Sequence, residues 1–246
     1  MKKINCSEIW GGNQRVDTDV CSASLTASLF SSVVGGGKGG DIYYFSVCGK
    51  DRLTRVAVAD VVGHGEAVSK MSQRLYDSLA KFMNGLDGSQ ILQRLNKLAG
   101  KNGHGAITTA VILTYNAEDS RMYYSYAGHP PILICRKGEK IWRPIPLPKD
   151  SPSGNLPLGV LNDTPYDEQS LELGPGDRLF SYTDGVIEAP RAPGQLFGMD
   201  GLLKVLNQNA ASRLVLLKQK ILDSLYDFTR GSFKHDDVTF LVMEIN

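Results

Sequence analysis

Cysteine, histidine and excess charge of one sign are all scarce in this chain of 246 residues. The four cysteines never form a Cys-x-x-Cys pair, which argues against a zinc knuckle or a disulfide framework and favours reduced thiols. The four histidines include no pair at the i, i+4 spacing that binds zinc on a helix. The formal net charge is only +1, so the chain lacks the basic excess that nucleic acids and anionic membranes attract.

Long apolar runs are also absent. The longest uncharged stretch, residues 20–37, is rich in serine, threonine and glycine and is too polar to span a bilayer. The first residues, MKKINCSEIWGG, carry lysines without the apolar segment of a signal peptide. We therefore expect a cytoplasmic protein that neither inserts into a membrane nor binds nucleic acid.

Familiar nucleotide-binding and nucleophile motifs are missing or stand in the wrong context. There is no G-x-x-x-x-G-K-[ST] loop and no G-x-S-x-G elbow. A G-x-G-x-x-G match at residues 35–40 precedes an extended segment, whereas a dinucleotide site needs a helix there. The residues thus favour neither a dinucleotide enzyme nor a serine nucleophile.

The chain does contain strands in runs and helices in adjacent pairs, a pattern that predicts an α+β protein with antiparallel sheets. Six of the 11 prolines fall within residues 144–165, which we expect to be a long irregular loop. Alternating or aromatic and β-branched segments predict strands at 41–48, 54–62, 106–114, 121–127, 132–136, 168–173, 178–183 and 238–245. Helical spacing of apolar residues predicts helices at 66–83, 89–98, 199–207 and 212–229.

Aspartate stands at four separate strand ends: Asp41, Asp60, Asp184, and the pair Asp236 and Asp237. Any one of them could simply cap a turn or the following helix. If the four ends converge, however, the like charges cannot all stay ionised without cations. Oxygen ligands favour hard divalent ions, so the prediction is Mg²⁺ or Mn²⁺ rather than zinc.

Six short motifs in a fixed order extend this observation. They are Gly39-Gly40-Asp41, Ala59-Asp60-Val61-Val62-Gly63-His64-Gly65, Ala127-Gly128-His129-Pro130-Pro131, Leu156-Pro157-Leu158-Gly159-Val160, Tyr182-Thr183-Asp184-Gly185-Val186-Ile187-Glu188 and Asp236-Asp237-Val238-Thr239. Together they resemble the SpoIIE-type branch of the metal-dependent (PPM) serine/threonine protein phosphatases. The resemblance covers about residues 36–246, taken as a SpoIIE-like PPM phosphatase domain. It leaves residues 1–35 as an unassigned N-terminal extension.

The resemblance implies a four-layer αββα sandwich, in which two antiparallel sheets are flanked by helices. It also implies two Mn²⁺ or Mg²⁺ ions at one end of the sandwich. Asp60 would lie between the two ions and the backbone carbonyl of Val61 would be a further ligand. Asp184 and Asp236 would complete the core site, and Asp41 would join the metal shell.

The activity implied is hydrolysis of phosphoserine or phosphothreonine in a regulatory protein by a bridging hydroxide on the two-metal centre. A phosphorylated anti-sigma-factor antagonist is the kind of substrate that the resemblance suggests. Asp60, Asp184 and Asp236 would be the catalytic residues. His64 is a candidate general acid, although a turn residue or a phosphate contact fits its spacing from Asp60 better. Tyr43, Tyr44 and Phe45 occupy the region where many members carry a second aspartate, which puts a third ion in doubt.

Two alternatives remain open. One is a catalytically silent module of the same fold that only binds its partner, although such a module has no need of a costly anionic cluster. The other is a Mg²⁺-dependent cyclic-nucleotide synthase, suggested by Gly39-Gly40-Asp41. It is disfavoured because Ile42 and Tyr43 stand where that class has Glu-Phe.

Overall fold

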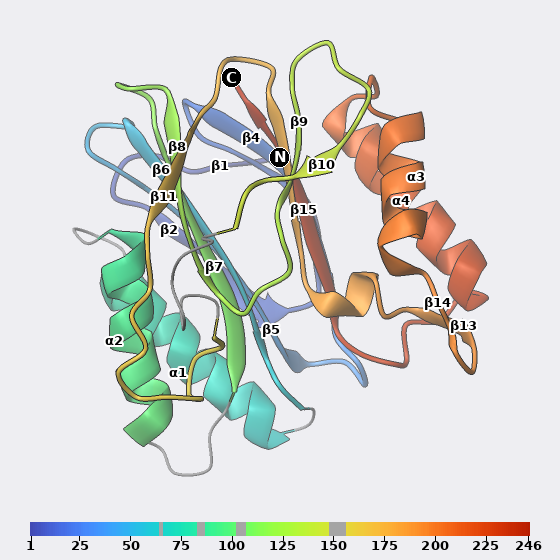
Figure 1. Ribbon diagram of the computed structural model, residues 1–246, viewed down its shortest axis with the longest axis horizontal. Helices are drawn as coiled ribbons and strands as arrows, with labels where there is room; N and C mark the ends of the chain where they lie inside the picture. Colours follow the sequence, from blue (N-terminus) through green and yellow to red (C-terminus); the bar gives the residue numbers. More distant parts are fainter. Residues whose placement is uncertain (64–65, 83–86, 102–106, 148–155) are drawn as a thin grey trace.

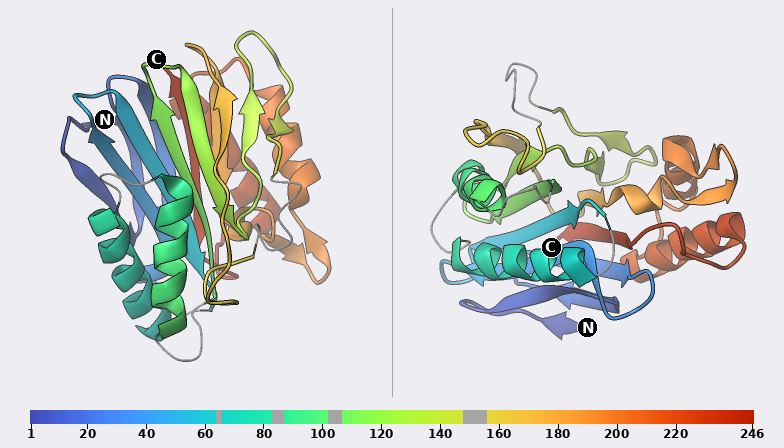
Figure 2. Two further views of the ribbon diagram at one scale, coloured as in Figure 1. Left: turned by 60° about the vertical axis from the view of Figure 1, so that its left-hand side comes forward. Right: turned by 90° about the horizontal axis from the view of Figure 1, so that it is seen from below.

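The structure, a computed structural model, describes residues 1–63, 66–82, 87–101, 107–147 and 156–246. These residues form two β-sheets stacked face to face, with a pair of helices on each outer side (Figure 1). The views in Figure 2 show the same layering, with α1 (Glu66–Phe82) and α2 (Gly88–Lys101) lying across one sheet. The predicted α+β class and the four-layer αββα sandwich are therefore confirmed.

One sheet has seven strands and a single parallel contact, between β1 and β3. Its order is β1 (Lys2–Lys3), β3 (Val16–Cys21), β4 (Leu25–Ser32), β15 (Val238–Ile245), β12 (Arg178–Tyr182), β9 (Leu133–Cys135) and β10 (Arg143–Pro144). The other sheet has six antiparallel strands. Its order is β11 (Gln169–Glu172), β8 (Arg121–Ala127), β7 (Thr108–Asn116), β6 (Leu53–Val61), β5 (Lys38–Cys48) and β2 (Ile9–Gln14).

The helices cover the outer faces because each presents one apolar stripe to a sheet. The first pair packs on the six-stranded sheet and the second on the seven-stranded sheet (Figure 1). The helices are α1 (Glu66–Phe82), α2 (Gly88–Lys101), α3 (Gly198–Gln208) and α4 (Leu214–Thr229). Between β12 and α3 lie the 3₁₀ turn η1 (Asp184–Val186) and a small hairpin, β13 (Pro190–Ala192) and β14 (Gln195–Leu196). No helix in the described ranges is long and apolar enough to cross a membrane.

Side-chain alternation on β5 shows how the core is divided. Tyr43 and Phe45 belong to the apolar core between the two sheets, while Ile42 and Tyr44 belong to the core beneath α1 and α2. A strand buried on both faces must be apolar in both sets of positions, and this explains the aromatic run that marked it in the sequence. Each such buried side chain contributes roughly 1.5–3 kcal/mol through burial.

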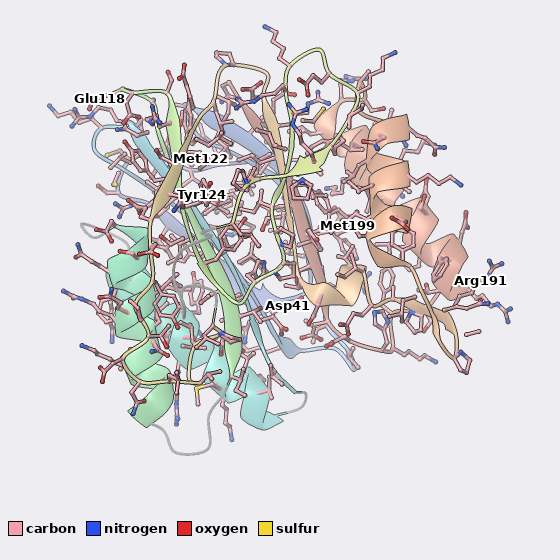
Figure 3. All side chains as sticks on the ribbon, viewed as in Figure 1. Asp41, Glu118, Met122, Tyr124, Arg191 and Met199 are labelled. Carbon is pink, nitrogen blue, oxygen red and sulfur yellow. The ribbon has the colours of Figure 1, made fainter. Side chains whose placement is uncertain are left out.

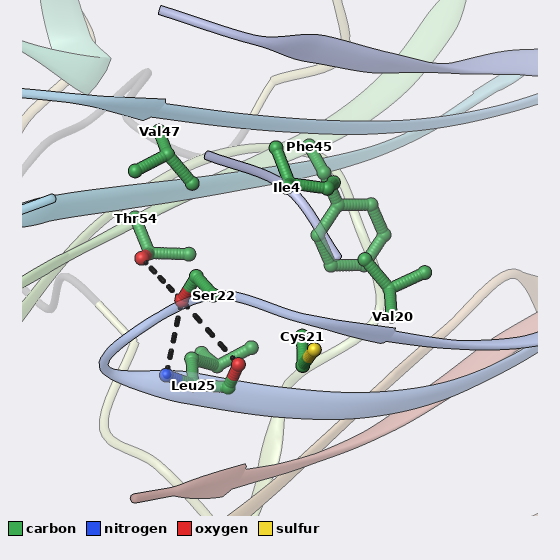
Figure 4. Close-up of a pocket in the computed structure, with 8 residues that line it drawn as sticks. All are labelled: Ile4, Val20, Cys21, Ser22, Leu25, Phe45, Val47 and Thr54. Carbon is green, nitrogen blue, oxygen red and sulfur yellow. Dashed lines mark hydrogen bonds between the residues drawn. The ribbon is translucent and has the colours of Figure 1, made fainter. Parts of the chain in front are cut away.

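The two sheets are also joined at one end by hydroxyl groups. In Figure 4 the hydroxyl groups of Ser22 and Thr54 lie 2.8 Å apart, and Ser22 also bonds the backbone of Leu25. The apolar crevice beside them, lined by Ile4 and Phe45 among others, has no space for a water molecule. This end of the sandwich is therefore closed, and it lies at the start of β6, opposite the end where β6 carries Asp60.

Residues 1–35, left unassigned by the sequence, supply four strands. β2 pairs with β5, and β4 pairs with β15 along the whole length of both strands. The segments before and after residue 36 thus share both sheets. The turn between β4 and β5 uses three successive glycines with positive φ, Gly35, Gly36 and Gly37, a conformation that other residues rarely adopt.

Candidate active site

Four strand ends meet at the open end of the sandwich. The antiparallel pairing of β5 with β6 places the start of β5 beside the end of β6, and the pairing of β12 with β15 does the same in the other sheet. A hydrogen bond joins the two sheets there, because the hydroxyl of Thr183, just after β12, donates to Asp41 Oδ2 on β5 at 2.8 Å. Figure 3 places Asp41 at this end, far from Glu118 at the other.

Asp41, Asp60, Asp184, Asp236 and Asp237 form the aspartate cluster. Burial raises the pKa of Asp60 to about 7. The charges of Asp184, Asp236 and Asp237, beside the strand ends of the other sheet, raise it as well. The pKa of Asp184 is raised by burial, and that of Asp236 by burial together with the charge of Asp184. The structure therefore brings the predicted metal ligands within electrostatic reach of one another.

Asp41 lies deepest in the cluster, with only 1% of its surface exposed. Burial raises its pKa well above the ordinary value, and the charge of Asp60 raises it further. Thr183 orients this carboxyl group through the bond to Oδ2, while the Thr183 backbone is held by Thr239 of β15. Sequence reasoning did not single out Thr183, and its place directly before Asp184 was the only available signal.

Asp237 has a different structural role from its neighbour Asp236. Its Oδ1 accepts a hydrogen bond from the Val34 backbone at 2.8 Å, and its Oδ2 accepts one from the Gly40 backbone at 2.7 Å. The carboxylate of Asp237 thus fixes both ends of the glycine turn between β4 and β5. Of the pair, Asp236 therefore stays the predicted cation ligand.

The chemistry of the donor groups suits a hard cation. At Gly40, an added Cβ would stand 2.8 Å from the Val61 carbonyl oxygen, 3.1 Å from Val68 Cγ1 and 3.5 Å from Asp60 Oδ1, so the two oxygens lie close to the same point. None of the ion pairs between described residues involves the cluster. Carboxylate and carbonyl oxygens without a cationic partner are the donors that Mg²⁺ and Mn²⁺ prefer.

The carboxyl groups do not yet enclose a common point. Among the described residues, no three acidic, histidine or cysteine side chains stand close enough together to hold one ion. Some of their oxygens are directed to internal hydrogen bonds instead, such as Asp236 Oδ1, which accepts from the Asp237 backbone at 2.8 Å. Cation binding therefore requires these side chains to turn toward a shared centre.

The histidines divide clearly. His64 lies outside the described residues. His129 is buried, its Nδ1 lies 3.2 Å from the Thr109 hydroxyl, and burial lowers its pKa to about 3, so it is a neutral packing residue. His235, which sequence reasoning left aside, places Nε2 2.9 Å from the Gly185 carbonyl oxygen.

Replacing Asp41 with asparagine should stabilise the protein in the presence of a chelator. The raised pKa of Asp41 means that ionisation of the folded state is penalised, and this penalty is absent below the unfolded pKa and grows as the pH rises above it. An amide oxygen can still accept from Thr183. We expect the Tm of Asp41→Asn to exceed that of the unmodified chain by at least about 2 °C at pH 8, corresponding to roughly 1 kcal/mol. The difference should shrink toward pH 4, and a lower Tm at both pH values would contradict the argument.

Comparisons with known proteins show the family to which the chain is related. Residues 50–246 match the family model described as "Stage II sporulation protein E (SpoIIE)". Phosphoserine phosphatase RsbU of Bacillus subtilis is 30% identical over 208 residues, covering 83% of this chain and 58% of RsbU. The chain thus spans a little over half the length of that relative.

Solved structures show the same fold. The PP2C phosphatase domain of SpoIIE from Bacillus subtilis, solved with a fragment of its regulatory domain, superposes with a TM-score of 0.73 at 21% identity, covering 91% of this chain and 64% of that one. RsbX, solved in complex with magnesium, superposes with a TM-score of 0.66 at 19% identity, covering 94% of this chain and 100% of that one. The matched family model spans most of the sequence, and the predicted family is confirmed. The chain belongs to the SpoIIE family.

Proposed function

We propose that this chain is a protein phosphatase that hydrolyses phosphoserine or phosphothreonine in a regulatory protein, with two divalent cations, Mn²⁺ or Mg²⁺, as cofactors. The observation that carries the proposal is the meeting of the aspartate cluster at one end of the sandwich without an ion pair to any lysine or arginine among the described residues. Such a concentration of acid is costly to fold, and a binding module would not need it.

Each acid has a proposed place. Asp60 would be the ligand shared by the two ions, the Val61 carbonyl would be a further ligand, and Asp184, Asp236 and Asp41 would complete the set. When bound, the cations would lower the pKa of a water ligand and offset charge on the phosphoryl oxygens.

The rest of the chain holds these ligands in position. Thr183 orients Asp41, and Asp237 anchors the turn on which Gly40 sits. Gly40 itself has no side chain that would collide with the Val61 carbonyl oxygen.

The substrate class rests on the relatives. RsbU is a phosphoserine phosphatase by name, and RsbX is a neighbour solved with magnesium. We extend both properties to this chain, and propose a phosphorylated switch protein, such as an anti-sigma-factor antagonist, as its substrate.

Metal addition and removal test the proposal directly. With millimolar MnCl₂ the purified chain should hydrolyse p-nitrophenyl phosphate, and a chelator should abolish the reaction. Binding to the folded state should also raise the Tm, because an ion at 100 times its dissociation constant adds about 2.7 kcal/mol of stability. Hydrolysis that persists in chelator would exclude the two-metal site. A metal-induced rise in Tm without hydrolysis of any phosphate ester would instead favour the silent binding module.

A further inference from the structure

An exposed aliphatic pair borders the aspartate cluster. Val62 has 57% of its surface exposed and Ile107 has 40%. The Val62 backbone N–H donates to the Ile107 carbonyl at 2.9 Å, so the two residues lie side by side just beyond the paired ends of β6 and β7. We call Val62 and Ile107 the apolar edge.

Strand pairing places the apolar edge next to the strand end that carries Asp60. On β6, Val56 and Val58 face the core between the sheets, so Asp60 continues the same face, and on β7 Val111 and then Thr109 do so. Val62 and Ile107 each lie one residue outside their strand, and the hydrogen bond between them prolongs the pairing of β6 with β7. Asp60 and Thr109 are direct register partners. The apolar edge therefore follows directly on the paired strand ends that carry Asp60.

Single exposed aliphatic residues are common and need no explanation. Here the position is informative, because a phosphate ester held beside Asp60 must carry its neighbouring residues over the adjoining surface. The charge of the aspartate cluster disfavours an acidic residue next to the phosphorylated residue of the substrate. An aliphatic residue there would bury the apolar edge, which is favourable.

We propose that Val62 and Ile107 determine substrate specificity by contacting an aliphatic side chain next to the phosphorylated residue. This inference rests on the proposed phosphatase function. It adds a preference that the chemistry of the carboxyl groups alone does not set, because those groups act only on the phosphoryl group and its attacking water.

The test uses two phosphoserine peptides that differ only in the residues flanking phosphoserine, leucine in one and asparagine in the other. With Mn²⁺, the unmodified chain should show a kcat/KM about tenfold higher for the leucine peptide, which corresponds to roughly 1.4 kcal/mol. In the double variant Val62→Ser, Ile107→Ser, the ratio should fall to within about twofold. The matched control is Val215→Ser, Leu216→Ser, a second exposed aliphatic pair, on α4, which should keep the tenfold ratio.

The outcomes separate this inference from the function on which it rests. Equal turnover of both peptides by the unmodified chain, or a preference retained in the Val62, Ile107 variant, would overturn the specificity proposal while leaving the phosphatase intact. Turnover of p-nitrophenyl phosphate but of neither peptide would overturn it as well. Absence of metal-dependent turnover of all three compounds would refute the phosphatase function itself.

Discussion

Replacing Asp60 with asparagine should lower the metal-dependent turnover of p-nitrophenyl phosphate at least a hundredfold. The charges of Asp184, Asp236 and Asp237 raise the pKa of Asp60, and Asp60 Oδ1 and the Val61 carbonyl oxygen both lie close to Gly40. An amide in its place removes the negative charge that strengthens binding of a divalent ion, and such metal and electrostatic contributions account for most of the catalysis of phosphoryl transfer. Asp184→Asn should lower turnover to a comparable extent, because Asp184 lies just after the end of β12 in the other sheet. The measurement is kcat/KM with Mn²⁺ for each variant.

The controls for this experiment address folding and charge. Asp223→Asn removes one carboxylate from the exposed side of α4 and should leave turnover within about twofold of the original, as surface substitutions usually do. The metal-free Tm of Asp60→Asn should not fall, because the substitution relieves repulsion within the aspartate cluster. An Asp60→Asn protein that folds and retains more than a tenth of the original activity would remove Asp60 from the metal site.

The elements with strong local patterns were predictable from the sequence. β15 was predicted at 238–245, the residues it occupies. α1 occupies Glu66–Phe82 of the predicted 66–83, and residue 83 lies outside the described residues. In both elements the apolar residues are regularly spaced and the first residue can be recognised in the sequence. The aspartates at the strand ends could be identified from the sequence for the same reason, because the end of an alternating run of residues is a local feature.

The strands of residues 1–35 were not predictable in this way. β4 reads LTASLFSS and β3 reads VDTDVC, and small or polar residues in both obscure the preference for extended structure. Their stability comes from tertiary pairing, as in the match of β4 with β15 about 200 positions away. The anchoring role of Asp237 depends on the same long-range contact, because its partners Val34 and Gly40 lie 203 and 197 positions away in sequence. No local pattern encodes such a contact.

Replacing Gly185 with alanine should reduce turnover about as strongly as losing a ligand. An added Cβ at Gly185 would collide with the Asp237 backbone carbonyl, well inside the 3.0 Å that real Cβ atoms keep, and would stand 3.5 Å from Asp236 Cβ. Because the obstacle is backbone rather than a flexible side chain, the segment before β15 must move, and Asp236 moves with it. A misplacement of about 1 Å at a catalytic group can cost about a hundredfold in rate. We expect a loss of that size in kcat for p-nitrophenyl phosphate with Mn²⁺.

Gly174 provides the matched control, because a Cβ added there meets nothing within 4 Å. Gly174→Ala should retain both activity and Tm. If Gly185→Ala loses activity but keeps a cooperative thermal transition, the cause is displacement of the acids and not global unfolding. Its Tm should also respond less to Mn²⁺, since the displaced Asp236 binds the ion more weakly. Full activity in Gly185→Ala would mean that Asp236 tolerates displacement, which is incompatible with its assignment as a metal ligand.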